Sequence, residues 1–117
     1  MKAYLINPSD KCVTEVAYDG DYHSIAPSIH AKSGLFDIVR IADAGQQADL
    51  FVDDEGLMYE GGNPHGYFQV HHGQGQWQTL AGYALVLDCD IETGDSVAAS
   101  CTLNWIVGHV RFAPAGH

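Results

Sequence analysis

The sequence is poor in positive charge. Only five of its 117 residues are Lys or Arg, against fifteen Asp and Glu, and the formal net charge is −10. From Ile41 to Val110 there is no Lys or Arg at all. Proteins that bind nucleic acids or anionic membrane surfaces draw affinity from clustered Lys and Arg. The composition therefore argues against both of these partners and favours a basic protein partner.

Long apolar runs and paired cysteines are also missing. No segment approaches the roughly 20 apolar residues that span a membrane, and the N-terminal apolar run is too short for a signal peptide. The three cysteines, Cys12, Cys89 and Cys101, are odd in number and show no Cys-x-x-Cys spacing. We expect a cytoplasmic protein with free thiols, because disulfides persist mainly in oxidising compartments.

The length and apolar content predict a single domain over residues 1–117 with one hydrophobic core. Short β-favouring runs between Gly, Pro and Asp turns predict an α+β fold, with a mainly antiparallel sheet of five or six strands and one or two short helices. Candidate strands are 2–7, 12–18, 35–42, 50–52, 57–59, 80–87, 97–100 and 110–112, and candidate helices are 22–31 and 103–107. Residues 67–71 fit either a strand or a short helical turn. We expect the tail, residues 113–117, to be frayed.

An acidic turn follows the apolar run Leu50–Val52. It consists of Asp53, Asp54 and Glu55, and Gly56 after them provides the backbone freedom for a turn. Adjacent carboxylates repel one another, so we expect all three to be exposed. The spacing of the following residues does not fit an EF-hand calcium loop.

Other acidic residues and one aromatic residue extend this candidate binding surface. Trp77 lies between glutamines in a predicted polar loop, where an exposed aromatic side chain often anchors a protein interface. The residues expected to contact a partner are Asp53, Asp54, Glu55, Glu60, Trp77, Asp88 and Asp90.

Three histidines, His65, His71 and His72, lie close together beside a Gly-rich loop. Imidazole is a common metal ligand, and the acidic turn would supply oxygen ligands if the loops meet. The spacing matches no zinc motif, and neighbouring His71 and His72 on a strand would point to opposite faces. A metal-binding module or metal-dependent enzyme using these histidines is one hypothesis.

Motifs for catalysis and for tightly bound cofactors are missing from the sequence. It has no phosphate-binding loop and no G-x-S-x-G nucleophile motif. We therefore identify no catalytic residue, predict no cofactor and favour a non-enzymatic protein.

Three segments together resemble a family of small uncharacterised proteins carried by phages, plasmids and bacteria. They are Phe36–Ile41, Leu50–Leu57 and Leu80–Leu87, and Glu15–Gly20 fits the same pattern. The histidine-rich loop and the C-terminal tail depart from it. The resemblance implies an accessory protein of mobile elements and indicates no catalytic residues.

This resemblance gives the acidic residues a possible role. Small acidic proteins of phages and plasmids often block host nucleases, restriction enzymes or CRISPR machinery by occupying basic grooves. A nucleic-acid duplex presents about one negative charge per 1.7 Å, which a row of carboxylates can imitate. We therefore expect an acidic inhibitor of a host nucleic-acid-handling or defence protein. An exposed edge strand would also allow a homodimer.

Overall fold

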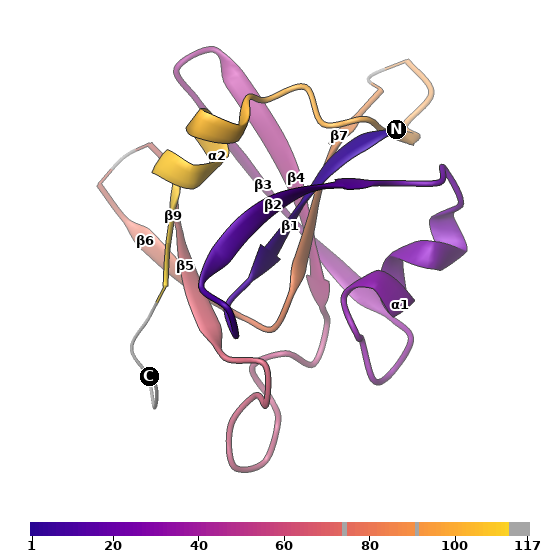
Figure 1. Ribbon diagram of the computed structural model, residues 1–117. Helices are drawn as coiled ribbons and strands as arrows, with labels where there is room; N and C mark the ends of the chain where they lie inside the picture. Colours follow the sequence, from indigo (N-terminus) through magenta and orange to yellow (C-terminus); the bar gives the residue numbers. More distant parts are fainter. Residues whose placement is uncertain (74, 91, 113–117) are drawn as a thin grey trace.

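The computed structural model describes residues 1–73, 75–90 and 92–112 (Figure 1). It confirms the predicted α+β class with mainly antiparallel strands. The strands are β1 (Lys2–Asn7), β2 (Cys12–Ala17), β3 (Phe36–Asp43), β4 (Gln46–Asp53), β5 (Tyr67–His71), β6 (Trp77–Ala81), β7 (Ala84–Cys89), β8 (Ser96–Val97) and β9 (Val110–Phe112). The helical segments are η1 (Tyr22–Ser24), α1 (Ile25–Ser28) and α2 (Leu103–Gly108).

The first sheet has the strand order β2-β1-β7-β4-β3, with β8 added beside β7. Two hairpins, β1–β2 and β3–β4, lie on either side of β7, which pairs with β1 and β4. The four apolar residues Ala84–Leu87 of β7 are all buried, as expected for a central strand covered on both faces. Ala44 and Gly45 join β3 to β4 with φ values of 53° and 80°, which is typical of a tight hairpin turn.

The second sheet has the order β6-β5-β9 and packs with α2 against one face of the first sheet. Phe68, Val70 and Ile106 contribute side chains to this shared core, and all three are fully buried. Figure 1 shows α1 on the other side of the first sheet. There Ile25 and Ile29 pack in a second apolar cluster of the first sheet.

The predicted strand 80–87 is wrong, because the chain breaks at Gly82. This residue has a φ of +80°, and its N–H donates to the Gly66 carbonyl at 2.9 Å. A positive φ is easily reached only by glycine, so the apolar run turns a corner there. The two halves become β6 and β7 in different sheets.

Several shorter predictions also need correction. Residues 57–59 form no strand: Leu57 ends the turn 54–57, Met58 and Tyr59 are irregular, and the Met58 N–H donates to the Glu55 carbonyl. The predicted helix 22–31 is reduced to η1 and α1, and His30 ends it with a φ of +55°. Of the expected strand 97–100, only Val97 is in a strand, β8. The predicted frayed tail lies outside the described residues.

The structure divides the chain into two layers with different charge. We define the second layer as residues 61–82 and 98–112, which hold β5, β6, β9 and α2, and the first layer as residues 1–60 and 83–97. The second layer contains no Asp or Glu and only one Lys or Arg, Arg111. No helix in the described part of the chain is long and apolar enough to cross a membrane.

Candidate metal centre

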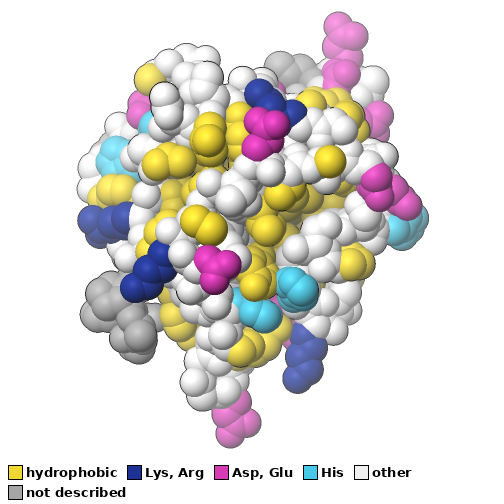
Figure 2. Space-filling model, viewed as in Figure 1, with side chains coloured by type: hydrophobic (Ala, Val, Ile, Leu, Met, Phe, Trp, Pro, Cys, Tyr) yellow, Lys and Arg dark blue, Asp and Glu magenta, His cyan; other side chains and the backbone are white. Residues whose placement is uncertain are grey.

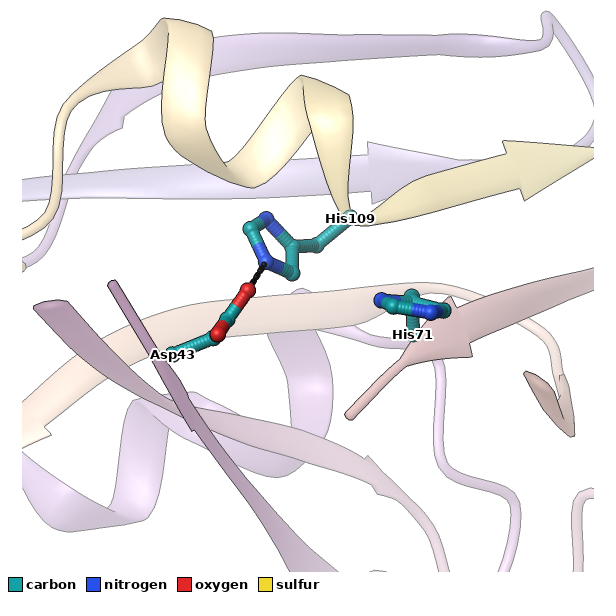
Figure 3. Close-up of side chains that lie close together, drawn as sticks. All are labelled: Asp43, His71 and His109. Atoms are coloured by element: carbon teal, nitrogen blue, oxygen red, sulfur yellow. Dashed lines mark hydrogen bonds and ion pairs between the residues drawn. The ribbon is translucent and has the colours of Figure 1, made fainter. Parts of the chain in front are cut away.

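Asp43, His71 and His109 meet where the two layers join (Figure 3). Asp43 is the last residue of β3, His71 is the last residue of β5, and His109 lies between α2 and β9. One ligand atom from each residue lies within 4.8 Å of the other two. The fold thus brings two imidazoles and one carboxylate together from three separate elements.

The hydrogen bonds of His109 determine where its ring carries a proton. Its Nδ1 lies 2.7 Å from the Trp105 carbonyl oxygen, and its Nε2 lies 2.8 Å from Oδ2 of Asp43. A carbonyl only accepts hydrogen bonds, so Nδ1 is the donor. In the neutral ring, Nε2 then carries a lone pair that faces another acceptor. A cation between Nε2 and the Asp43 carboxylate, either a proton or a metal ion, makes this contact favourable.

The neighbours of His109 fix this orientation. The Trp105 ring stacks on the imidazole with ring centroids 4.3 Å apart. The Trp105 indole N–H donates to the Asp43 backbone carbonyl at 3.0 Å, so one tryptophan contacts both members of the pair. A carbonyl that orients a histidine through its second nitrogen is typical of metal sites.

His71 lies between two backbone amides of the following loop. The Gly73 N–H points at its Nδ1 and the Gly75 N–H at its Nε2, each at 3.1 Å. A neutral imidazole has only one nitrogen with a free lone pair, so only one of these contacts is a hydrogen bond. The loop therefore does not satisfy both nitrogens of His71 at once.

Gly73 brings the loop backbone against the Asp43 carboxylate. Its φ is +82°, and a Cβ at this position would lie 2.7 Å from both Cγ and Oδ1 of Asp43. The hydrogen bond with His109 lowers the pKa of Asp43 below its ordinary value, against an opposing effect of burial. The carboxylate is thus held in the ionised form that binds metals.

This donor set suits particular metals. Two imidazole nitrogens and one carboxylate oxygen are common ligands of Zn²⁺ and of non-haem Fe²⁺. Ca²⁺ and Mg²⁺ prefer sites made of oxygen ligands alone. Three protein ligands also leave a coordination position for water or another ligand.

The structure brings one of the three predicted histidines to this centre. His71 is part of it, whereas the Nε2 of His72 lies 2.7 Å from Oε1 of Gln78. His65 stacks with Tyr83 and His30, at centroid distances of 4.8 and 5.4 Å. Burial, together with the charge of His30, lowers the pKa of His65.

Sequence reasoning missed Asp43 and His109. They are 66 positions apart, and no motif spacing connects them. The one feature that could have pointed to them is their position in the sequence, because each residue lies directly beside the end of a predicted strand. The acidic turn that was expected to supply oxygen ligands is not part of the cluster.

Asp53 corrects the expectation that the whole acidic turn is exposed. Asp53 is only 6% exposed. Its carboxylate accepts hydrogen bonds from the Tyr59 hydroxyl at 2.8 Å and from the Glu55 N–H at 2.9 Å. These donors replace the water that burial removes. Glu55 itself is exposed, and Asp54 is half-buried.

The remaining acidic candidates do not form one row with the turn. Asp53 ends β4, whereas Asp88 lies near the start of that strand and accepts a hydrogen bond from Gln47. At about 3.3 Å per residue, these positions are roughly 16 Å apart. Asp90 is half-buried at the Asp88 end, and Glu60 is exposed near the turn. Figure 2 shows acidic side chains scattered over one face, at its margin and in its middle, with apolar side chains between them.

Trp77 differs from its prediction as an exposed loop residue. It lies in β6 and is half-buried. The guanidinium carbon of Arg111 lies 4.1 Å from the centre of its ring. The ring also lies 5.0 Å from that of His71, so Trp77 borders the candidate metal centre.

Comparisons with protein-family models, curated proteins and solved structures find no match for this chain. We therefore base its function on the geometry of the site itself.

Proposed function

We propose that this protein binds a divalent transition-metal ion through Asp43, His71 and His109. The observation that carries this proposal is the pair of acceptors at His109. Its Nδ1 donates to a carbonyl, and its Nε2 faces the Asp43 carboxylate at 2.8 Å. A metal ion bound to both groups, with His71 as the third ligand, satisfies them without protonating His109.

Metal titration of the purified protein tests this proposal. After removal of metals with a chelator, we expect one equivalent of Zn²⁺ or Co²⁺ to bind by calorimetry, with a Co²⁺ absorption spectrum that indicates nitrogen and oxygen ligands. Asp43→Asn and His109→Gln should each weaken binding at least 100-fold. His72→Gln is the matched control and should bind as the original protein does.

The pH dependence of binding adds a second test. Protons compete with a metal ion for the lone pairs of its ligands, so metal affinity is compared between pH 7.5 and 5.5. We expect affinity to fall steeply across this range. Equal affinity in the original protein and both ligand variants would reject the site, and so would the lack of any stoichiometric binding.

A second candidate function is the inhibition of a basic host protein. The loop after β4 favours it, because Leu57 and Met58 are 61% and 79% exposed between the exposed Glu55 and Glu60. This loop is preorganised, since the Asn63 side chain donates to the Gly56 carbonyl at 3.0 Å. Apolar side chains flanked by carboxylates suit a partner whose apolar pocket has a basic rim.

Capture of a partner at two salt concentrations tests this second function. A nuclease-treated host lysate should yield one basic nucleic-acid-handling protein, retained at low salt and released at high salt. Met58→Ser combined with Glu55→Gln should abolish capture, whereas Glu92→Gln should not. If the double variant retains the same partner, the loop is not the binding surface.

A further inference from the structure

The outer face of the second sheet is polar and adjoins the candidate metal centre. The strand register places Trp77 opposite His71, and Thr79 and Arg111 opposite Gln69. These side chains share one face, because directly opposed residues in antiparallel strands point the same way. Alternate residues of the same strands are buried in the core. His71 therefore belongs both to this face and to the metal centre.

Arg111 is held in place on this face by Trp77 and Gln69. Its guanidinium carbon lies 4.1 Å from the centre of the Trp77 ring, and its Nε donates to Oε1 of Gln69 at 2.6 Å. Gln69 in turn donates to the Thr79 hydroxyl at 3.0 Å. Within the described residues, Arg111 forms no ion pair. Its terminal nitrogens keep the planar set of donors that matches a phosphate or carboxylate group.

The first layer offers a contrast in Arg40. This side chain donates twice to the Asp49 carboxylate, at 2.7 and 3.0 Å, so its charge is already neutralised. Arg111 lies in a layer that contains no Asp or Glu. No acidic residue of its own layer neutralises Arg111, although the protein as a whole carries a charge of −10.

We propose that Arg111, positioned by Trp77 and Gln69, binds the anionic group of a small phosphate- or carboxylate-bearing ligand beside the metal centre. The position of the ligand beside a metal ion rests on the proposed function. The link is His71, whose ring lies 5.0 Å from that of Trp77. A metal ion held by Asp43, His71 and His109 would supply a second positive charge on the same side of Trp77 as His71 and would add to the attraction for an anion.

Anion titrations with metal-loaded and metal-free protein test this inference. The probes are inorganic phosphate and acetate. Calorimetry measures their affinity, and the NMR signal of the Arg111 Nε–H reports whether they bind at this side chain. We expect at least one probe to bind and to shift this signal. Arg111→Gln should weaken binding at least tenfold, and Arg111→Lys should weaken it less because it keeps the charge. Lys32→Gln, which removes an exposed positive charge in the first layer, should change affinity less than twofold.

The outcomes separate this inference from the metal proposal. Tighter binding of phosphate than of acetate identifies a phosphate-bearing ligand, and the reverse order identifies a carboxylate. Anion binding that depends on Arg111 in a protein that takes up no metal supports the anion site and rejects the metal centre. Equal affinity in Arg111→Gln and the original protein overturns the anion site, as does the failure of both probes to bind, even if metal binds normally.

Discussion

The two layers of this protein differ more in charge than in architecture. The first layer carries all fifteen acidic residues and four of the five Lys and Arg, whereas the second has no carboxylate and four of the seven histidines. The first layer therefore has a formal charge of −11 and the second a formal charge of +1, which together give the net charge of −10. The charge of the whole chain predicts a basic partner, yet the second layer has none of the acidic residues on which that prediction depends.

The candidate metal centre lies where these two layers meet. The first layer contributes Asp43 from the end of β3, and the second contributes His71 and His109. Within the described residues, the side chains of the second layer that could ligate a metal together with this carboxylate are two imidazoles. The difference between the layers thus explains why this junction has the composition of a metal site.

The largest expected effect comes from breaking the contact between the layers. Phe68 is fully buried in the core that both layers share. Phe68→Ala should destabilise the protein by about 3–5 kcal/mol, because it leaves a cavity at this contact. Urea denaturation measures the change. Ile38→Ala, at a residue that is 53% exposed, is the control and should lose less than about 1 kcal/mol.

This variant also shows whether the layers unfold together. If they form one cooperative unit, hydrogen exchange in β1 and β5 should accelerate to the same extent in Phe68→Ala. Faster exchange confined to β5 would show that the second layer unfolds by itself.

A second prediction concerns the loop that covers Asp43. Gly73→Ala should destabilise by about 2–3 kcal/mol and weaken metal binding at least tenfold, because the new Cβ collides with the carboxylate. Gly75→Ala is a matched control. Gly75 has a similar φ of +79° but nothing within 4 Å of the new Cβ. It should show only the backbone strain of about 1–2 kcal/mol, measured by thermal unfolding. Equal loss of metal affinity in both variants would contradict the collision.

The third prediction compares the two arginines. The Asp49 side chain is only 5% exposed, so Arg40→Gln leaves a nearly buried carboxylate without its charged partner. We expect a loss of about 1–2 kcal/mol, because half of the Arg40 side chain is in contact with solvent and screening weakens the pair. Arg111→Gln should change stability by less than about 0.5 kcal/mol. Chemical denaturation of both variants checks this contrast, and similar losses would show that Arg111 has a structural role instead.

Much of the fold was predictable because its strands are short β-favouring runs separated by turn residues. Local patterns located β1, β5 and the β3–β4 hairpin, since each is determined by neighbouring residues. The break at Gly82 was not predictable from apolar periodicity, because it depends on a positive φ and on the Gly66 carbonyl. The burial of Asp53 was equally hidden, since its donor, the Tyr59 hydroxyl, comes from a turn that was expected to be a strand.

The candidate site was predictable only in part. His71 was identified because it is one of three closely spaced histidines beside a Gly-rich loop, and imidazole is a common metal ligand. Asp43 and His109 come together through the packing of the two sheets, and 66 positions separate them. Sequence spacing reveals metal ligands when they lie on one hairpin or helix, which is not the arrangement here.

The smallest expected effect is a pH dependence that arises where His65 of the second layer packs against His30 and Tyr83 of the first. Burial and the nearby His30 hold the pKa of His65 below its ordinary value of about 6.5. The folded state therefore binds this proton less readily than the unfolded state, so stability should fall as the pH decreases through the unfolded pKa. Melting temperatures between pH 7.5 and 5.5 measure this decrease. The decrease should be smaller in His65→Gln. It should be unchanged in His72→Gln, because His72 lies beside Gln78 and is not part of the His30–His65 pair. If the melting temperature of His65→Gln decreases as much as that of the original protein, His65 is not the source of the pH dependence. The carboxylates of the first layer do not explain a decrease in this range, because they take up protons at more acidic pH.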